Sequence, residues 1–198
     1  MQTNASTDHP FPGDEQVSPE HIAVAIEALC PELAKGAQPP EGFEVSTVAA
    51  KSPAKGSRRA CRFAAMQYLY AWDMVRPEIR IDHLRRFFES LEHPRETYAF
   101  GEELAESAIE HLDEIDEIIT ARAENWEFVR IAKVDLAILR LATYELFFRN
   151  DIPPIVTINE AVEMSKIFST AEARRFVNGI LDKLLASVNR PAREAFRG

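Results

Sequence analysis

The feature that most constrains the fold is a nearly unbroken apolar run from Val134 to Phe148, VDLAILRLATYELFF, in which eleven of fifteen residues are apolar. Wound at 3.6 residues per turn, these side chains point in all directions around the helix axis. A helix that is apolar on every side must be covered on every side. The run is also too short and too charged to cross a bilayer. It therefore predicts the central helix of an all-α domain.

The few polar residues of this run are scattered around the helix axis and do not form one wet face; they are Asp135, Arg140, Thr143 and Glu145. An unpaired charge inside a protein is costly, so buried charges normally have hydrogen-bonding partners. We therefore expect Arg140 and Glu145 to be at least partly buried and to serve a structural role.

The composition is that of an ordinary globular protein, with 46% hydrophobic and 28% charged residues among 198. The N-terminus does not resemble a secretory signal, and no apolar run is long enough for a membrane span. The two cysteines, Cys30 and Cys61, lack a metal-type spacing. Both are therefore interpreted as reduced thiols of a cytoplasmic protein. The net charge of −9 argues against broad, non-specific nucleic-acid binding, so any such contact requires a local basic patch.

Residues 1–56 are predicted to form an N-terminal extension. Its first 17 residues are rich in proline and poor in apolar side chains, which indicates disorder. A proline-initiated amphipathic helix is expected at about 18–35, followed by a linker. The helix has no partner within the extension, so docking on the main domain and binding to another protein are both open.

The main domain is predicted over residues 57–190, with a short tail at 191–198. Apolar residues at helical spacing, separated by capping residues and prolines, indicate about seven helices, and no alternating run indicates a strand. The expected helices cover 57–74, 82–91, 96–112, 113–119, 134–148, 157–168 and 172–188, with a short helical turn around Trp126 and Phe128.

Two local features of the last helices lead to specific expectations. Thr157 and Glu160 have the spacing of a capping box, which predicts that a helix begins at Thr157. Gly179 lies inside the last predicted helix, where glycine costs ~1 kcal/mol relative to alanine. We therefore expect a neighbouring helix to approach closely at Gly179.

The sequence offers no support for an enzyme. Di-metal sites in helical bundles use Glu-x-x-His pairs, and no histidine has that spacing. The carboxylate-rich segment 102–127 is better interpreted as a solvated acidic face. Phosphate-binding loops and nucleophile elbows are also missing from the sequence. We therefore expect no catalytic residues, no metal and no cofactor.

The stronger functional feature is a cluster of arginines at the start of the first helix of the main domain. Arg58, Arg59 and Arg62 are expected as near-neighbours on its exposed side, and Arg174 and Arg175 form a second pair where the last helix begins. Helix N-termini attract phosphate, and arginine adds forked donors. Such clusters are also common on ordinary solvated surfaces, so both interpretations remain open on spacing alone.

Four motifs, in order along the chain, resemble those of the NusB family of bacterial transcription antitermination factors. The first is Arg58-Arg59 followed by AMQYLYAW at 65–72, which resembles the arginine-rich first helix of the family. The others are VDLAILRLATYEL at 134–146, INEAVEMSKIF at 158–168 and FVNGILDKL at 176–184. The resemblance spans about residues 57–188 and leaves the extension outside.

This resemblance implies an all-helical fold of two small bundles packed together, and a protein that is not an enzyme. NusB-like proteins bind the boxA element of ribosomal RNA leaders together with NusE, a small-subunit ribosomal protein. They join NusA, NusG and RNA polymerase in a larger complex that passes terminators. The resemblance leaves monomer and homodimer both open.

Carried over by position, the resemblance implies RNA contacts for Arg58, Arg59, Arg62 and Arg175. It also implies that Tyr70 and Asp135 lie near the NusE-binding surface. Ala60 interrupts what is often a longer arginine run in the family. This departure keeps an alternative in view, a protein-only adaptor whose RNA surface has decayed.

Overall fold

The computed structural model describes residues 57–75, 80–91, 93–123 and 127–193. These residues form seven α-helices and two 3-10 helices, and no strand occurs among them. The all-α prediction with about seven helices is therefore confirmed. The predictions for the N-terminal extension, for Trp126 and for the end of the tail lie outside the described residues. The bounds are α3 Arg58–Val75, α4 Arg80–Glu89, η1 Arg95–Tyr98, α5 Ala99–Glu110, α6 Leu112–Thr120, η2 Phe128–Arg130, α7 Lys133–Phe148, α8 Pro154–Phe168 and α9 Ala171–Ala186.

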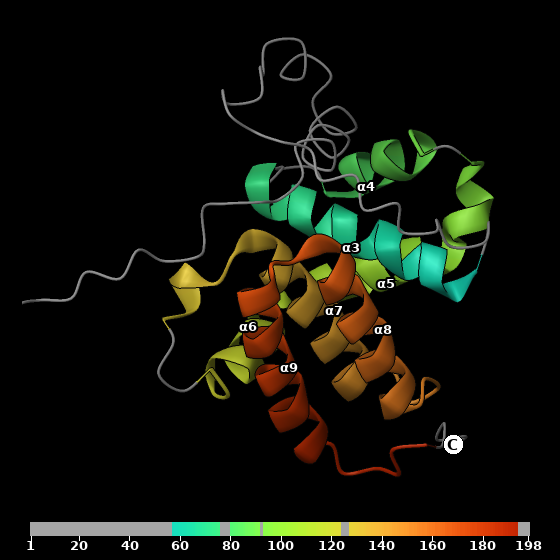
Figure 1. Ribbon diagram of the computed structural model, residues 1–198. Helices are drawn as coiled ribbons and strands as arrows, with labels where there is room; N and C mark the ends of the chain where they lie inside the picture. The colour runs from blue at the N-terminus through green and yellow to red at the C-terminus, as the bar shows by residue number, and fades with distance from the viewer. Residues whose placement is uncertain (1–56, 76–79, 92, 124–126, 194–198) are drawn as a thin grey trace, which may run out of the picture.

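The helices form two packed groups, as the resemblance implies (Figure 1). Helices α3, α4 and α5 make the first group, in which α3 packs mainly on α5. Helices α6 to α9 make the second, with α8 and α9 beside α7. Helix α3 also packs directly on α7, and this packing is the main contact between the two groups. Within the described residues, no helix is long and apolar enough to cross a membrane.

Helix α7 is the centre of the fold, as its apolar run predicts. Every residue from Val134 to Leu146 is buried, and Leu139 is completely inaccessible to solvent. Helices α3, α5, α6, α8 and α9 all contact it. A helix covered on all sides explains why the apolar residues follow no single stripe.

Arg140 and Glu145 are buried in α7 and have polar partners, as their structural interpretation predicts. Arg140 forms a two-pronged ion pair with Asp116 of α6, with both N–O distances 2.7 Å. Its other terminal nitrogen lies 3.1 Å from Asp73 of α3. Lys133 pairs with the same Asp73 carboxylate. This network links three helices around the N-terminal half of α7.

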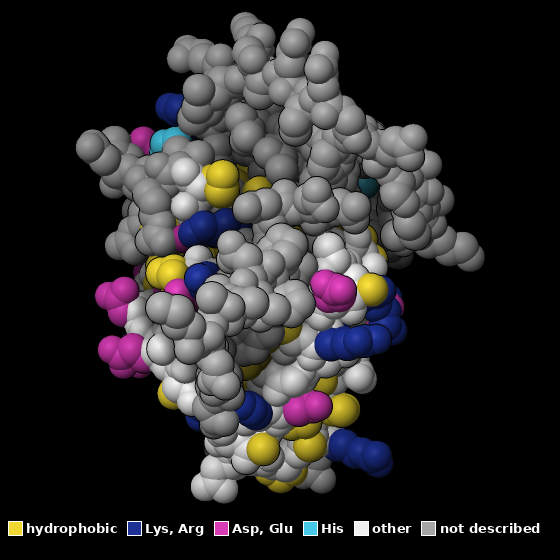
Figure 2. Space-filling view, turned by 60° about the vertical axis from the view of Figure 1, so that its left-hand side comes forward, with side chains coloured by type: hydrophobic (Ala, Val, Ile, Leu, Met, Phe, Trp, Pro, Cys, Tyr) yellow, Lys and Arg dark blue, Asp and Glu magenta, His cyan; other side chains and the backbone are white. Residues whose placement is uncertain are grey.

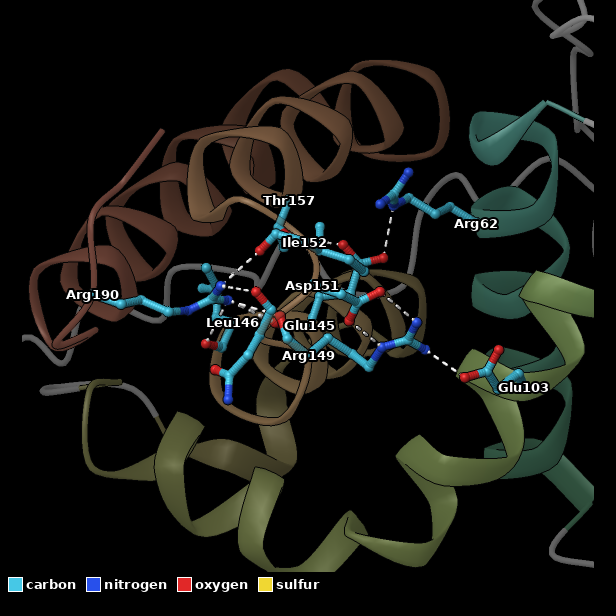
Figure 3. Close-up of polar contacts among 10 residues, drawn as sticks. Arg62, Glu103, Glu145, Leu146, Arg149, Asp151, Ile152, Thr157 and Arg190 are labelled. Atoms are coloured by element: carbon cyan, nitrogen blue, oxygen red, sulfur yellow. Dashed lines mark hydrogen bonds and ion pairs between the residues drawn. The ribbon is translucent and has the colours of Figure 1, made fainter. Parts of the chain in front are cut away.

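The C-terminal end of α7 is closed by a residue from beyond α9. The guanidinium of Arg190 donates hydrogen bonds to five backbone carbonyls at this end, those of Glu145, Leu146, Arg149, Asn150 and Ile152 (Figure 3). The last carbonyls of a helix lack intrahelical donors, and an arginine can supply them. The carbonyl of Ala192 also accepts a hydrogen bond from the Ile155 amide of α8 at 2.9 Å, so the segment after α9 belongs to the folded domain at least as far as Ala192.

Gly179 does not mark a close helix approach, contrary to our expectation. A Cβ atom built on Gly179 would meet nothing within 4 Å, and the residue is exposed on α9. The close approach occurs at Gly101 on α5, where a Cβ would lie 2.3 Å from the carbonyl oxygen of Cys61. Only a residue without a side chain allows α5 to lie so near α3.

The capping-box prediction at Thr157 is also wrong. Helix α8 begins one turn earlier, at Pro154, whose ring fixes a helical φ at a position where no amide donor is needed. The Thr157 hydroxyl instead donates to the Glu145 carboxylate at 2.7 Å. Side-chain caps occur instead at Ser57 and Thr170, whose hydroxyls accept from the amides of Ala60 and Ala173 at the starts of α3 and α9.

Candidate nucleic-acid interface

Helix α3 begins at a well-formed N-cap, and its first two turns carry three arginines. The Ser57 hydroxyl accepts from the Ala60 amide at 3.1 Å, which holds the helix start in place. Arg58, Arg59 and Arg62 extend from these turns into three different environments. Their availability to a ligand therefore differs, although the sequence presents them as one cluster.

Arg62 does not lie on the exposed side of α3, which corrects our expectation. The residue is buried, and its Nε lies 2.7 Å from a carboxylate oxygen of Glu145 on α7 (Figure 3). The other Glu145 oxygen accepts from Thr157 of α8. Arg62 thus joins α3, α7 and α8 inside the domain, because a buried carboxylate on α7 needs a cationic partner. Its guanidinium is committed to this bond.

Arg59 is half exposed and held by a carboxylate. Its Nε and one terminal nitrogen donate to the two Glu160 oxygens of α8 at 2.9 and 2.8 Å. This hydrogen-bonded pair raises the pKa of Arg59, with the nearby Glu163 adding to the effect. Glu160, expected to cap its own helix, therefore serves as the partner of Arg59. Phosphate binding by Arg59 requires competition with this carboxylate.

Arg58 is exposed and stacks on an aromatic ring. Its guanidinium carbon lies 3.8 Å from the centroid of the Phe100 ring on α5. In the part of the chain that the structure describes, Arg58 has no hydrogen bond or ion pair with a carboxylate. Its positive charge is therefore the most available of the three.

Arg175 lies on another helix, α9, and is exposed. Neither Arg175 nor the nearby Glu172 takes part in an ion pair with any residue the structure places. The fold therefore presents Arg175 as a separate cation and does not join it by a bond to the first turn of α3. Its role in RNA binding stays a prediction.

Tyr70 and Asp135 are both buried within this single chain, Tyr70 on α3 and Asp135 in the first turn of α7. Burial raises the pKa of the Tyr70 hydroxyl. Burial also raises the pKa of Asp135, and the hydroxyl of Ser169 only partly offsets this effect. The Oδ1 atom of Asp135 accepts no hydrogen bond from any residue that the structure describes. A partner-binding role for either residue stays a prediction.

The charged side chains are mixed in sign on one face of the molecule. Figure 2 shows lysine and arginine side chains lying beside acidic ones where the side chains of that face are coloured. Among the placed residues, histidine, cysteine and acidic side chains form no group of three or more suited to a metal ion. The arrangement favours a few specific contacts over broad electrostatic attraction.

The sequence did not indicate two of the residues that shape this site. The sequence position of Glu160 predicted a capping residue, and the helical spacing of Phe100 is that of a core residue. Both act across the fold, on arginines 101 and 42 positions away in the chain. No local pattern connects positions so far apart, so only the packing of α3 on α5 and α8 reveals them.

Comparison with known proteins agrees with the fold and with the motifs. The model of the NusB family matches residues 59–186, which include nearly all of the helical domain. The chain belongs to the NusB family. Its NusB relatives include the transcription antitermination protein of Trichlorobacter lovleyi, 47% identical over 131 residues that cover 66% of this chain and 92% of the relative. The corresponding protein of Treponema pallidum is 44% identical over 136 residues, covering 67% and 95%.

Solved NusB structures share the fold. The structure of T. maritima NusB aligns with a TM-score of 0.61 and 34% identity, covering 69% of this chain and 95% of that one. A structure of the antitermination factors NusB and NusE in complex with double-stranded RNA matches at 26% identity and a TM-score of 0.54, covering 66% and 96%. The N-terminal 58 residues lie outside the family match.

Proposed function

We propose that this chain is a transcription antitermination factor that binds boxA RNA of ribosomal RNA leaders together with NusE. It acts in the cytoplasm and without catalysis, in a larger complex with NusA, NusG and RNA polymerase. The family membership and the names of the relatives support antitermination. The related complex of NusB and NusE with RNA supports the two binding partners.

The observation that carries the RNA part of the proposal is the capped first turn of α3. This turn presents Arg58 and Arg59 to solvent at the start of the segment matched by the family. A helix N-terminus favours anions, and guanidinium groups bind phosphate through forked donors. At the start of α3, Arg58 and Arg59 are the two arginines accessible to RNA, because Arg62, one turn further on, is buried.

Two accessible arginines on a protein of net charge −9 give only a small electrostatic contribution. Each neutralised phosphate of a single strand contributes about 0.7 to the magnitude of the slope of log affinity against log salt. We therefore expect the chain alone to bind RNA weakly and with a shallow salt dependence. A partner that extends the RNA-binding surface accounts for the joint recognition.

The alternative is a protein-only adaptor. It is favoured by the pairing of Arg59 with Glu160 and by the burial of Arg62, since both reduce the cationic surface. Under this alternative, the chain binds NusE but neither protein gains RNA affinity from the other.

The test is a titration of fluorescently labelled, single-stranded boxA RNA with the full chain, with NusE and with both, at 50 and 200 mM salt. The proposal predicts that the pair binds more tightly than either protein alone. NusE binding without any gain in RNA affinity would support the adaptor. A scrambled RNA of equal length is the control for non-specific attraction.

A further inference from the structure

Phe100 lies at the junction of α5 and α3, beside the arginines. It is the second residue of α5 and is partly buried against the core. The next residue, Gly101, brings the α5 backbone against the carbonyl of Cys61 on α3. This close approach places the Phe100 ring against the first turn of α3. The position of the ring is therefore determined by backbone packing and not by a flexible loop.

Three guanidinium groups surround this ring. The guanidinium carbon of Arg58 lies 3.8 Å from the ring centroid, that of Arg62 5.4 Å, and that of Arg149 5.5 Å. Aromatic rings attract cations to their faces, and this attraction increases as water is excluded. Phe100 thus organises arginines that come from two different helix ends.

Two of these three cations are already neutralised by carboxylates. Arg62 pairs with the buried Glu145. Arg149 pairs with Asp151 at 2.8 Å and with Glu103 at 2.9 Å (Figure 3). The charges of Arg62 and Arg149 are therefore already balanced and are not available to an incoming anion or base.

Arg58 differs from both, because it combines exposure with stacking. No carboxylate pairs with it anywhere in the described ranges. At 3.8 Å its guanidinium is in stacking contact with Phe100 on one side, while the residue remains exposed. Holding a long side chain in one orientation before binding reduces the entropy that binding would otherwise cost.

We propose that Phe100 and Arg58 form a two-layer stacking platform for one unpaired base of the RNA. Phe100 is the positioning residue, and the outward face of Arg58 contacts the base. Proteins recognise single-stranded RNA by stacking its bases on aromatic rings and on arginine planes. This inference rests on the proposed function, and it adds a residue and a contact mode to it.

A base fits this arrangement better than a phosphate alone. A phosphate requires charge and donors, which a mobile surface arginine supplies without an aromatic neighbour. A ring that holds the guanidinium by one face leaves the opposite face as the feature presented to a ligand. The planar face is what a nucleobase contacts.

The experiment measures affinity for single-stranded boxA RNA in the presence of NusE, for the wild-type full chain and for three variants. Phe100→Leu removes the aromatic face, Phe100→Tyr retains it, and Arg58→Lys retains the charge without the plane. We expect Phe100→Leu and Arg58→Lys each to weaken binding about fivefold or more, as loss of a stacked base does. Phe100→Tyr and the control Arg85→Lys, at an exposed position of α4, should bind like wild type.

An abasic scan of the RNA separates stacking from phosphate contact and from a structural role. Removal of the one stacked base should weaken wild-type binding by as much as Phe100→Leu weakens binding of the intact RNA. With that abasic RNA, Phe100→Leu should cause no further loss of affinity. A thermal melt of each variant identifies any loss caused by unfolding; if Phe100→Leu unfolds, Arg58→Lys is scanned in its place.

The platform is overturned if wild-type binding is insensitive to every abasic position, or if neither Phe100→Leu nor Arg58→Lys weakens binding. Either result leaves the proposed function intact. Absence of wild-type RNA binding overturns the proposed function and the platform with it.

Discussion

Arg62 and Glu145 form an ion pair between α3 and α7 in which both side chains are almost completely buried, 5% and 1% exposed. The Nε of Arg62 lies 2.7 Å from Oε1 of Glu145. The hydroxyl of Thr157 on α8 donates a hydrogen bond to the other Glu145 oxygen. The pair joins the two helix groups near one end of α7, while Arg140 and Asp73 join them farther along it. The same bond removes one arginine from the candidate RNA surface.

Glu145→Ala should strongly destabilise the domain. Removal of the carboxylate leaves Arg62 charged and unpaired inside the protein, which costs about 3–5 kcal/mol. Urea denaturation followed by circular dichroism measures the change in the free energy of unfolding. The matched control is Glu89→Ala, which breaks the exposed Arg85–Glu89 pair and should leave the free energy of unfolding essentially unchanged. Equal stability of the two variants would contradict the structural role of Arg62.

Two buried aspartates should affect the pH dependence of stability in opposite directions. Burial opposes ionisation of Asp73, but hydrogen bonds from Lys133 and Arg140 outweigh it and hold its pKa below the ordinary value of 3.8. Its carboxylate therefore stabilises the fold above pH 3.8, and this contribution is lost as the pH falls through the folded pKa. Asp73→Asn should lower stability at pH 7 and flatten the acid side of the stability curve.

Asp135 should show the reverse behaviour. Burial raises its pKa, so its contribution is favourable in acid and is lost as the pH rises from 3.8 through the folded pKa. Asp135→Asn should increase stability at pH 7, with the difference shrinking below pH 4. Urea denaturation of both variants between pH 3 and 8 measures the two effects. Parallel curves for wild type and Asp135→Asn would contradict this prediction.

Gly101 and Gly179, which lie within described helices, should respond oppositely to alanine. Gly101→Ala places a Cβ against the Cys61 carbonyl and forces α3 and α5 apart, so stability should fall by about 1–3 kcal/mol. Gly179→Ala meets open space on an exposed helix face and should raise stability by about 0.5–1 kcal/mol. Thermal unfolding of the two variants under one condition provides the comparison. Destabilisation by Gly179→Ala would show that a close neighbour covers this glycine after all.

Glu160→Gln should tighten RNA binding. Arg59 is paired in a fork with Glu160, and neutralising the carboxylate frees the guanidinium for phosphate. An ion pair of this exposure contributes about 0.2–1 kcal/mol, so the gain should be roughly 1.5- to 5-fold. Glu89→Gln, on α4 and paired with Arg85, is the control. A loss of affinity in Glu160→Gln would show that the pair orients Arg59 for RNA instead of competing with it.

Helix α7 could be predicted from the sequence because its signal is local. An apolar run without a wet face can be satisfied only by burial on all sides, and its charges then require partners. The caps at Ser57 and Thr170 are equally local, since each depends on an amide three residues away. These features need no knowledge of which helices meet.

Arg62 and Thr157 could not be assigned from the sequence because their partner is remote. Both bond to Glu145, which lies 83 and 12 positions away, respectively. Helical spacing places Arg58 and Arg62 on neighbouring surfaces, but it does not show which of them a buried carboxylate will hold. The roles of Gly101 and Gly179 likewise depend on which helix faces pack together. Local helix propensity does not show this.

The measurement that most directly tests the position of the RNA is photo-crosslinking. A boxA RNA carrying 4-thiouridine at single positions is irradiated in complex with the full chain and NusE, and the crosslinked peptides are identified by mass spectrometry. We expect crosslinks in the first turn of α3, around Arg58 and Arg59, and at Phe100 on α5. Crosslinks confined to the acidic outer face of α6, with none at the start of α3, would contradict it.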